Sequence, residues 1–263
     1  MTNPQKSGFL AFYGAIKIDA MKAGSMGSTL TSEIKARALS LGADLAGIAD
    51  VALLKGLPTI PDDLLAPYRF AVSMAVALPR AVFSAIAAAP TPEYSAIYQT
   101  INRQLDDIAV GIARQLDRRG FAALPVPASQ VLDRETWHAA VSHKAVARMA
   151  GLGWQGKNLL LITPQYGSRV RLVTVLTDAP LSPDGPVNNR CGSCNCCRDA
   201  CPVNAIRGVN TDTHYDTRHQ AMFFSRCVEK LTRDFASRDN IGVPICGICI
   251  RACPFTMKGS IEK

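Results

Sequence analysis

The sequence predicts a layered α/β domain followed by a cysteine-rich C-terminal module, and two observations carry this prediction. Short apolar runs alternate with helical patterns over residues 29–180, as expected of a sheet covered by helices. All nine cysteines lie between Cys191 and Cys253, whereas the first 190 residues contain none. A secreted disulfide scaffold would spread its cysteines through a small domain. Their confinement to one segment therefore indicates metal ligands in a reducing compartment.

The composition is that of an ordinary globular protein. A chain of 263 residues, 48% hydrophobic and 19% charged, suits one large domain or a domain plus a small module. The net charge of +8 favours acidic partners, although the absence of a dense Lys/Arg run makes a scattered solvated surface an equal alternative. The apolar run at residues 9–18 contains Lys17 and is too short to cross a bilayer. We expect a cytoplasmic protein without a membrane partner.

The first elements are read from capping signals and apolar runs. Residues 1–28 are expected to form a loose N-terminal extension. A helix is predicted to start at residues 31–33 and to end at Gly42, because glycine is the usual residue just after a helix. Residues 44–49 predict a short strand. Residues 70–78 are almost wholly apolar, which predicts a strand covered on both faces.

The clearest helix in the sequence has apolar side chains at steps of three and four and is followed by Gly120. Its stripe consists of Tyr94, Ile97, Ile101, Leu105, Ile108, Ile112 and Leu116. Further along, strands are predicted at 121–126, 159–162 and 170–176, and a short helix at 142–150. Residues 180–186 are rich in proline and glycine and mark a boundary. The expected units are residues 1–28, the α/β domain 29–183 and the cysteine-rich module 184–263.

Two half-motifs organise the cysteines. The first is Cys191-x2-Cys194-x2-Cys197-x3-Cys201-Pro202, and the second is Cys246-x2-Cys249-x3-Cys253-Pro254, with Cys227 upstream in place of a missing first ligand. This is the cysteine run of bacterial ferredoxins, in which the fourth cysteine of each run binds the other cluster. The sequence therefore predicts a bacterial-ferredoxin-type module with two [4Fe–4S] clusters, and with it electron transfer.

The crossing of the fourth cysteines assigns the ligands. Cluster one takes Cys191, Cys194, Cys197 and Cys253, and cluster two takes Cys201, Cys227, Cys246 and Cys249. Cys196 is left over, as a bystander or as a replacement for Cys194 or Cys197. The alternative is a zinc site, but a single zinc needs only four ligands and would leave half of the cysteines and both Cys-Pro endings unexplained.

The stretch from 142 to 158 is the other dense feature. It contains Gly151, Gly153 and Gly156, which permit a close approach of the backbone to a large group. Trp154 offers a flat apolar face and Lys157 a cation. The simpler interpretation is a helix end followed by a tight turn into a strand.

Residues 151–158 (GLGWQGKN), 159–167 (LLLITPQYG) and 176–181 (LTDAPL), together with the double cysteine motif, resemble the epoxyqueuosine reductase family. The likeness covers residues 141–255 well and 29–80 loosely. It implies a corrinoid-binding α/β domain fused to a two-cluster module, an arrangement shared with reductive dehalogenases. It also implies that reduced ferredoxin or flavodoxin supplies electrons, which pass through the clusters to cobalamin. Gly153, Trp154 and Lys157 are then the expected contacts of the corrin.

Three departures from the family pattern affect the expected catalytic residues and substrate. The family's catalytic aspartate falls in register with Trp137 and His138, so that Asp133, Glu135 and His138 are the available proton donors. No Tyr-His-Gly segment occurs at residues 50–68, and the chain ends ten residues after Cys253. The redox core is therefore expected to be retained, and the substrate is open, with tRNA as one candidate.

The preferred interpretation is an iron–sulfur reductase related to epoxyqueuosine reductase. Cluster two, expected near the surface through Cys227, would accept electrons and pass them to cluster one. Asp133 and His138 are the preferred catalytic residues, while His138 and His143 could also be ordinary capping or surface histidines. The alternatives are a ferredoxin-like carrier without its own substrate and a protein that binds or activates a corrinoid.

Overall fold

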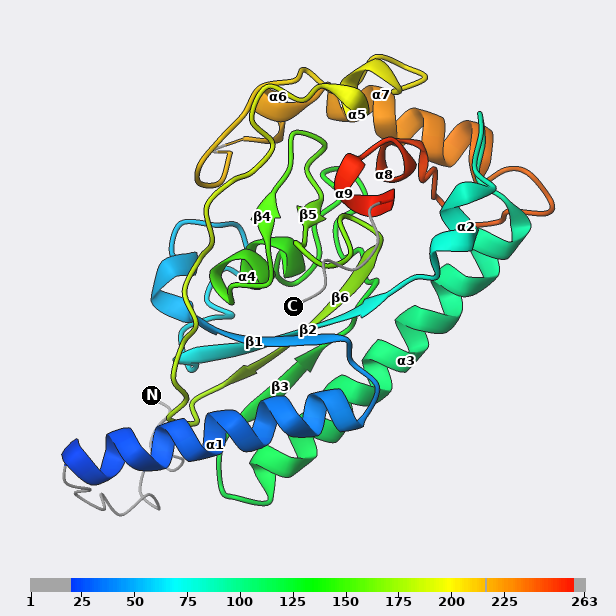
Figure 1. The fold of residues 1–263 in the computed structure, drawn as a ribbon. Helices are drawn as coiled ribbons and strands as arrows, with labels where there is room; N and C mark the ends of the chain where they lie inside the picture. The colour runs from blue at the N-terminus through cyan, green and yellow to red at the C-terminus, as the bar shows by residue number, and fades with distance from the viewer. Residues whose placement is uncertain (1–19, 216, 258–263) are drawn as a thin grey trace, which may run out of the picture.

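The structure is a computed structural model that describes residues 20–215 and 217–257 (Figure 1). Its centre is a sheet in the order β1–β2–β6–β3, formed by β1 (Leu45–Asp50), β2 (Phe70–Ala77), β6 (Val170–Thr177) and β3 (Ala123–Val126). Neighbouring strands in this sheet are antiparallel. The layered α/β class predicted from the sequence is confirmed.

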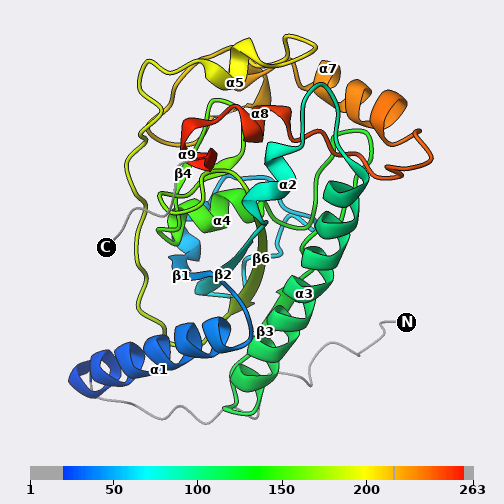
Figure 2. The ribbon, with the colours of Figure 1, turned by 45° about the vertical axis from the view of Figure 1, so that its right-hand side comes forward.

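Helices cover both faces of the sheet. Figures 1 and 2 show α1 (Ala20–Ser40) and α3 (Pro92–Asp117) on one face and α4 (His143–Met149) on the other. The alternation of side chains along β2 explains this arrangement, because Val72 and Met74 pack with the long helices whereas Ala71 and Ala75 pack with α4. The small alanines let α4 approach the sheet closely.

The long helix α3 follows its sequence signals. Thr91 caps its first turn by accepting a hydrogen bond from the backbone N–H of Tyr94 at 3.2 Å, and Pro92 takes the first helical position. The apolar stripe predicted for this segment is buried along most of its length, at Ile101, Leu105 and Ile108 among others. The helix therefore holds the sheet on one side and reaches the C-terminal module with its first turn.

Two boundaries differ from the prediction. Helix α1 begins at Ala20, so residues 20–28 are helical, whereas a loose extension was expected there. Residues 1–19 and 258–263 lie outside the described residues. The strand predicted at 159–162 is reduced to β5 (Leu161–Ile162), which pairs with β4 (Trp154–Gln155) in a separate small sheet.

The C-terminal module consists of short helices that share the main core with the α/β domain. They are α5 (Cys196–Asp199), α6 (Arg218–Ala221), α7 (Phe224–Glu229), the π-helix η2 (Lys230–Phe235), α8 (Ile248–Arg251) and α9 (Pro254–Met257); η1 (Val51–Leu54) and α2 (Arg80–Ser84) belong to the α/β domain. Ile241, Ile245 and Ile248 are buried in the same apolar cluster as Phe83 and Tyr94. The module is therefore fixed to the start of α3 and not tethered loosely.

An extended segment connects β6 to the first cysteine and is anchored to the edge of the sheet. Asp184 exchanges backbone and side-chain hydrogen bonds with Ile48, at 2.9 Å to its carbonyl and 2.7 Å from its N–H. The carboxylate of Asp184 also forms an ion pair with Lys35 of α1. Within the described residues, no helix is both long and apolar enough to cross a bilayer.

Candidate metal centre

Four cysteines from two distant segments of the chain surround one cavity. Cys191 and Cys194 lie in the loop that leads into α5, Cys197 lies in α5 itself, and Cys253 comes from the turn between α8 and α9. The same cavity is lined by other residues of two segments, namely Lys157, Asn158, Ile162, Pro254 and Phe255. These four cysteines are the set expected for cluster one when the fourth cysteines cross.

The other four expected ligands form a second group between α5, α7 and α8. Burial, followed by the neighbouring thiols of Cys246 and Cys201, raises the pKa of Cys227 to about 11. Burial also raises the pKa of Cys249, with Cys246 and Cys227 as its nearest contributors. This is the set expected for cluster two.

In both groups the cysteines are better suited to binding iron than to remaining as free thiols. Burial, followed by Cys253, Cys191 and Cys194, raises the pKa of Cys197 to about 11. Thiols that are costly to ionise alone become thiolate ligands when a metal supplies the compensating charge. Among residues 20–215 and 217–257, no three His, Cys, Asp or Glu side chains converge on a point where one metal ion could sit. Sulfurs spaced around a cavity fit a cluster, whereas zinc needs all four donors at about 2.3 Å.

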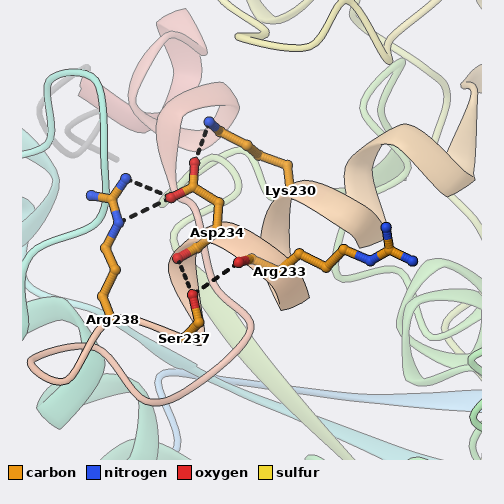
Figure 3. Close-up of polar contacts among 5 residues, drawn as sticks. All are labelled: Lys230, Arg233, Asp234, Ser237 and Arg238. Carbon is orange, nitrogen blue, oxygen red and sulfur yellow. Dashed lines mark hydrogen bonds and ion pairs between the residues drawn. The ribbon is translucent and has the colours of Figure 1, made fainter.

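The helix that carries Cys227 is stabilised by a compact set of ion pairs, drawn in Figure 3. The carboxylate of Asp234 accepts hydrogen bonds from Lys230 and from Arg238, at 2.7 and 3.1 Å for the two Arg238 nitrogens. Ser237 closes the end of η2 by donating to the carbonyl of Arg233 at 2.9 Å. Pairs of this exposed kind contribute little stability each, but together they fix the direction of the helix beside Cys227.

The glycine-rich stretch lies against the cysteine loop of cluster one. The indole nitrogen of Trp154 is 3.4 Å from the sulfur of Cys191, and the ammonium of Lys157 donates to the carbonyl of Cys194 at 2.9 Å. A Cβ atom at Gly153 would lie 2.2 Å from the carbonyl oxygen of Ile162, so glycine is needed for packing against β5. These contacts account for all three residues without a corrin.

The loop from Asp133 to His138 brings the two expected catalytic residues together. The Asp133 carboxylate accepts hydrogen bonds from the backbone N–H groups of Glu135 at 2.8 Å and Thr136 at 3.2 Å, and from the Thr136 hydroxyl. These bonds, led by the Thr136 side chain, lower the pKa of Asp133. His138 Nδ1 lies 2.7 Å from the same hydroxyl, and burial followed by Arg218 lowers the pKa of His138.

Arg218 connects this loop to the cysteine module. Its guanidinium donates to the carbonyl of Thr136 and, at 3.0 Å, to that of Trp137, and it lies 4.5 Å from the centre of the Phe224 ring on α7. Trp137 has a φ of 56°, a left-handed conformation that is costly for a bulky side chain. Arg218 therefore holds a strained loop next to the helix that carries Cys227.

The comparisons with known proteins agree with this geometry. The family described as "4Fe-4S double cluster binding domain" matches residues 190–256. An epoxyqueuosine reductase from Listeria monocytogenes is 53% identical over 68 residues, which cover 26% of this chain and 18% of that protein. Another, from Vibrio cholerae, is 27% identical over 267 residues, covering 86% of this chain and 67% of that protein. The chain is related to the epoxyqueuosine reductases.

Solved structures extend the likeness to the whole fold. An epoxyqueuosine reductase in complex with an epoxyqueuosine-modified tRNA stem loop has a TM-score of 0.57 at 26% identity, covering 89% of this chain and 67% of that chain. A reductive dehalogenase, reported with a mechanism for B12-dependent dehalogenation, has a TM-score of 0.68 at 20% identity, covering 89% of this chain and 33% of that one. The chain thus spans only a part of the length of several relatives, including the Listeria epoxyqueuosine reductase.

A polar group between α3 and β6 was not predicted from the sequence. The guanidinium of Arg171 lies 4.4 Å from the centre of the Tyr98 ring and donates to Asn102 Oδ1 at 2.9 Å. Burial alone would raise the pKa of Tyr98, but Arg171 and hydrogen bonds from Ser129 and Asn102 outweigh it, so that the pKa is lowered. Arg171 is a charged residue in a mostly apolar predicted strand, and this sequence signal could have indicated the group.

Lys144 completes this polar group. Burial, followed by Arg218 and Arg171, lowers the pKa of Lys144 to about 8, while Cys227 and Cys249 act in the opposite direction. Lys144 therefore lies in the electrostatic field of both the second cysteine group and Arg171. Its neighbour His143 is occupied on both nitrogens, 2.8 Å from the Thr174 hydroxyl and 2.9 Å from the Pro127 carbonyl oxygen, which leaves neither nitrogen for a cobalt ion.

Proposed function

We propose that the protein is an iron–sulfur reductase with two [4Fe–4S] clusters, which takes electrons from an external carrier and delivers them to a substrate. The grouping of the cysteines carries this proposal, because the cavity lined by Cys191, Cys194 and Cys197 is completed by Cys253 from the second half-motif. Crossed ligation of this kind is the feature of two-cluster ferredoxins. Reduced ferredoxin or flavodoxin is the class of carrier that fits.

The exposure of the ligands supports an order of electron transfer opposite to that expected from the sequence. Cys194 of cluster one is exposed, although Cys253 of the same set is buried, whereas all four ligands of cluster two are half-buried. Electron transfer slows steeply with distance, so an external carrier would reach cluster one first. Cluster two then faces the substrate side.

The group beside cluster two supports a site of reduction there. Lys144 interacts electrostatically with Cys227 and Cys249 and with the cations Arg218 and Arg171, and Arg171 in turn lowers the pKa of Tyr98. A two-electron reduction needs protons, and a phenol of lowered pKa donates its proton more readily than an ordinary tyrosine. Asp133, by contrast, is held ionised by its own loop and suits a positioning role.

The side chains expected to contact a corrin bear on whether a corrinoid binds beside them. Trp154 and Lys157, the side chains expected to contact a corrin, are 1% and 4% exposed and face the cysteine loop. These residues do not fit corrin contacts, and no reaction step is derived through a corrinoid. A corrinoid acceptor in this protein requires other contacts, on the side of cluster two.

Anaerobic purification with cob(II)alamin tests the proposal. About eight irons per chain, four in each of two clusters, and two interacting EPR signals after dithionite are expected. Cys227→Ser should lower the iron to about four, and Cys196→Ser, at a cysteine outside both sets, should retain eight. Zinc in place of iron, or full iron loading of Cys227→Ser, would contradict the two-cluster assignment.

The substrate is tested on the loaded protein. An epoxyqueuosine reductase is known in complex with a modified tRNA stem loop, so the first substrate to offer is an epoxyqueuosine-containing tRNA. Turnover with a chemical reductant, lost in Tyr98→Phe, would support a reductase of that substrate class. Two reducible clusters without turnover or corrinoid binding would favour the second candidate, an electron carrier, which the occupied carboxylate of Asp133 also favours.

A further inference from the structure

The residues expected to hold a corrin instead surround cluster one with hydrogen-bond donors and a buried positive charge. We propose that Trp154, Lys157 and Asn158 set the reduction potential of cluster one and make it an effective electron acceptor. This inference rests on the proposed function, because it requires that cluster one be present. It concerns a role for each side chain that is separate from ligating iron.

Trp154 supplies an N–H group to a ligand sulfur. Its side chain is 1% exposed, its indole nitrogen lies 3.4 Å from Cys191 Sγ, and its ring meets that of Phe255 edge-on at 5.0 Å between centroids. Phe255 lies two residues after Cys253, another ligand of the same cluster. The indole is therefore held between Cys191 of the first half-motif and Phe255 of the second. A sulfur gains electron density when its cluster is reduced, so an N–H···S bond stabilises the reduced form and raises the potential.

Lys157 supplies a buried positive charge, and none of its hydrogen-bond acceptors among the described residues is negatively charged. The residue is 4% exposed, and its ammonium reaches the carbonyl of Cys194 at 2.9 Å and Asn195 Oδ1 at 3.4 Å. Both acceptors are neutral, whereas a buried charge is costly unless an opposite charge compensates it. A cluster held by four thiolates is an anion, and its charge grows on reduction, so the ammonium also favours the reduced form.

Asn158 supplies an amide donor that is directed into the cavity. The residue is 5% exposed and lines the cavity with the four cysteines. Its Oδ1 accepts from the N–H of Leu160 at 3.2 Å, while Nδ2 is buried without a partner among the described residues. An unsatisfied buried donor costs about 1–3 kcal/mol, so an acceptor in the cavity is expected, and a cluster sulfur is of the right chemistry.

The glycines explain how these side chains reach the cluster. A Cβ at Gly156 would lie 2.4 Å from Ile162 Cδ1, and one at Gly153 would lie 2.2 Å from the Ile162 carbonyl oxygen. The stretch can therefore press onto β5, which places Trp154, Lys157 and Asn158 at the wall of the cavity. The glycine-rich sequence is a requirement of packing around cluster one.

EPR-monitored redox titration of the anaerobic holoprotein tests the inference. Trp154→Phe, Lys157→Met and Asn158→Leu are expected to lower the potential of one cluster while that of the other, which serves as internal reference, stays in place. Lys157→Met should have the largest effect, about tenfold in the equilibrium constant for reduction, which corresponds to about 59 mV for a one-electron couple. Lys157→Arg, which keeps the charge, should restore most of the potential.

Gln155→Leu is the matched control in the same stretch. Gln155 Oε1 lies 3.3 Å from both His214 Nδ1 and the N–H of Tyr215, so this neutral side chain is occupied by groups other than the ligand sulfurs, and its loss should leave both potentials unchanged. Iron is measured in every variant, and a variant that loses iron is replaced by another that removes the same donor or charge, Trp154→Leu or Lys157→Gln. Potentials that do not move in fully loaded Trp154→Phe and Lys157→Met would overturn the inference.

Titration of the same variants with cob(II)alamin separates the two interpretations of this stretch. Unchanged corrinoid affinity with a lowered cluster potential is expected. Lost corrinoid affinity with unchanged potentials would overturn the inference and restore Gly153, Trp154 and Lys157 as corrin contacts. Failure of the two-cluster assignment looks different, because the wild-type protein would then lack iron and show no cluster signal at all. Failure of substrate reduction alone would leave two loaded clusters whose potentials can still be measured.

Discussion

The surroundings of the two cysteine groups differ in a way that assigns them different tasks. The first group, Cys191, Cys194, Cys197 and Cys253, is exposed at Cys194 and is contacted by one short stretch, Trp154 to Asn158. The second group interacts electrostatically with Tyr94 and Lys144 of the α/β domain. A cluster at the surface with tuned potential suits electron entry. A cluster among titratable groups suits delivery of electrons together with protons.

The second cysteine group is also the more important one for stability, and paired substitutions test this difference. Cys249→Ser should remove cluster two and destabilise the fold strongly, because Ile245 and Ile248 beside it belong to the main apolar core. Cys194→Ser should remove cluster one with a smaller loss of stability, since Cys194 is exposed. Iron content and thermal unfolding of the two variants measure the difference. Equal losses of thermal stability would remove the distinction between the two regions.

The loop beside cluster two should depend on Arg218. Arg218→Gln removes charge-assisted hydrogen bonds to Thr136 and Trp137, each worth about 1.5–3 kcal/mol in protected sites and less at this half-buried one. The loop is then expected to exchange its amide hydrogens faster, while residues 153–158 beside cluster one keep their protection. Hydrogen exchange with mass spectrometry reports both segments in one experiment. Faster exchange in both would show a general loss of structure.

The buried His143 gives the cluster-two side a pH dependence of its own. Burial lowers its pKa from 6.5 to about 4, so the folded state favours the neutral ring. A base with a lowered pKa contributes stability that is complete above pH 6.5 and is lost as the pH falls toward 4. His143→Gln should flatten the fall in the free energy of unfolding over this range. Denaturant unfolding of the iron-free protein at several pH values measures the slope without interference from acid-labile clusters.

The sequence predicted those features that depend on spacing. Cysteine spacing gave the grouping around the cavity, because short loops leave few ways to reach one cluster. The apolar stripe of α3 and its cap at Thr91 are local signals, and that helix was predicted within a few residues. The early start of α1 was missed because it depends on tertiary packing: Gly27 lets the helix pass close to the carbonyl of Pro180, where a Cβ would lie 2.9 Å away.

The roles of individual side chains were harder to predict, because a pattern does not tell where a side chain points. Trp154 and Lys157 were identified as important, but their direction toward the cysteine loop is set by the pairing of β4 with β5. Asp133 was chosen as the nearest carboxylate to the expected register, and the hydrogen bonds of its loop could not be read from residue types. Tyr98 and Arg171 come together from a helix and a strand 73 residues apart.

The smallest expected effect is the ionisation of Tyr98, and it tests whether the cluster-two side is chemically distinct. Arg171 holds the pKa of Tyr98 below 10 against the opposing effect of burial, so Arg171→Met should raise it. A lowered tyrosine pKa contributes stability that is complete above pH 10 and is lost as the pH falls through the lowered pKa of the folded state. Ultraviolet difference titration, with Tyr98→Phe to identify the signal, measures the shift. An unchanged titration in Arg171→Met would remove Tyr98 as the proton donor and leave cluster two with Lys144 as its main titratable neighbour.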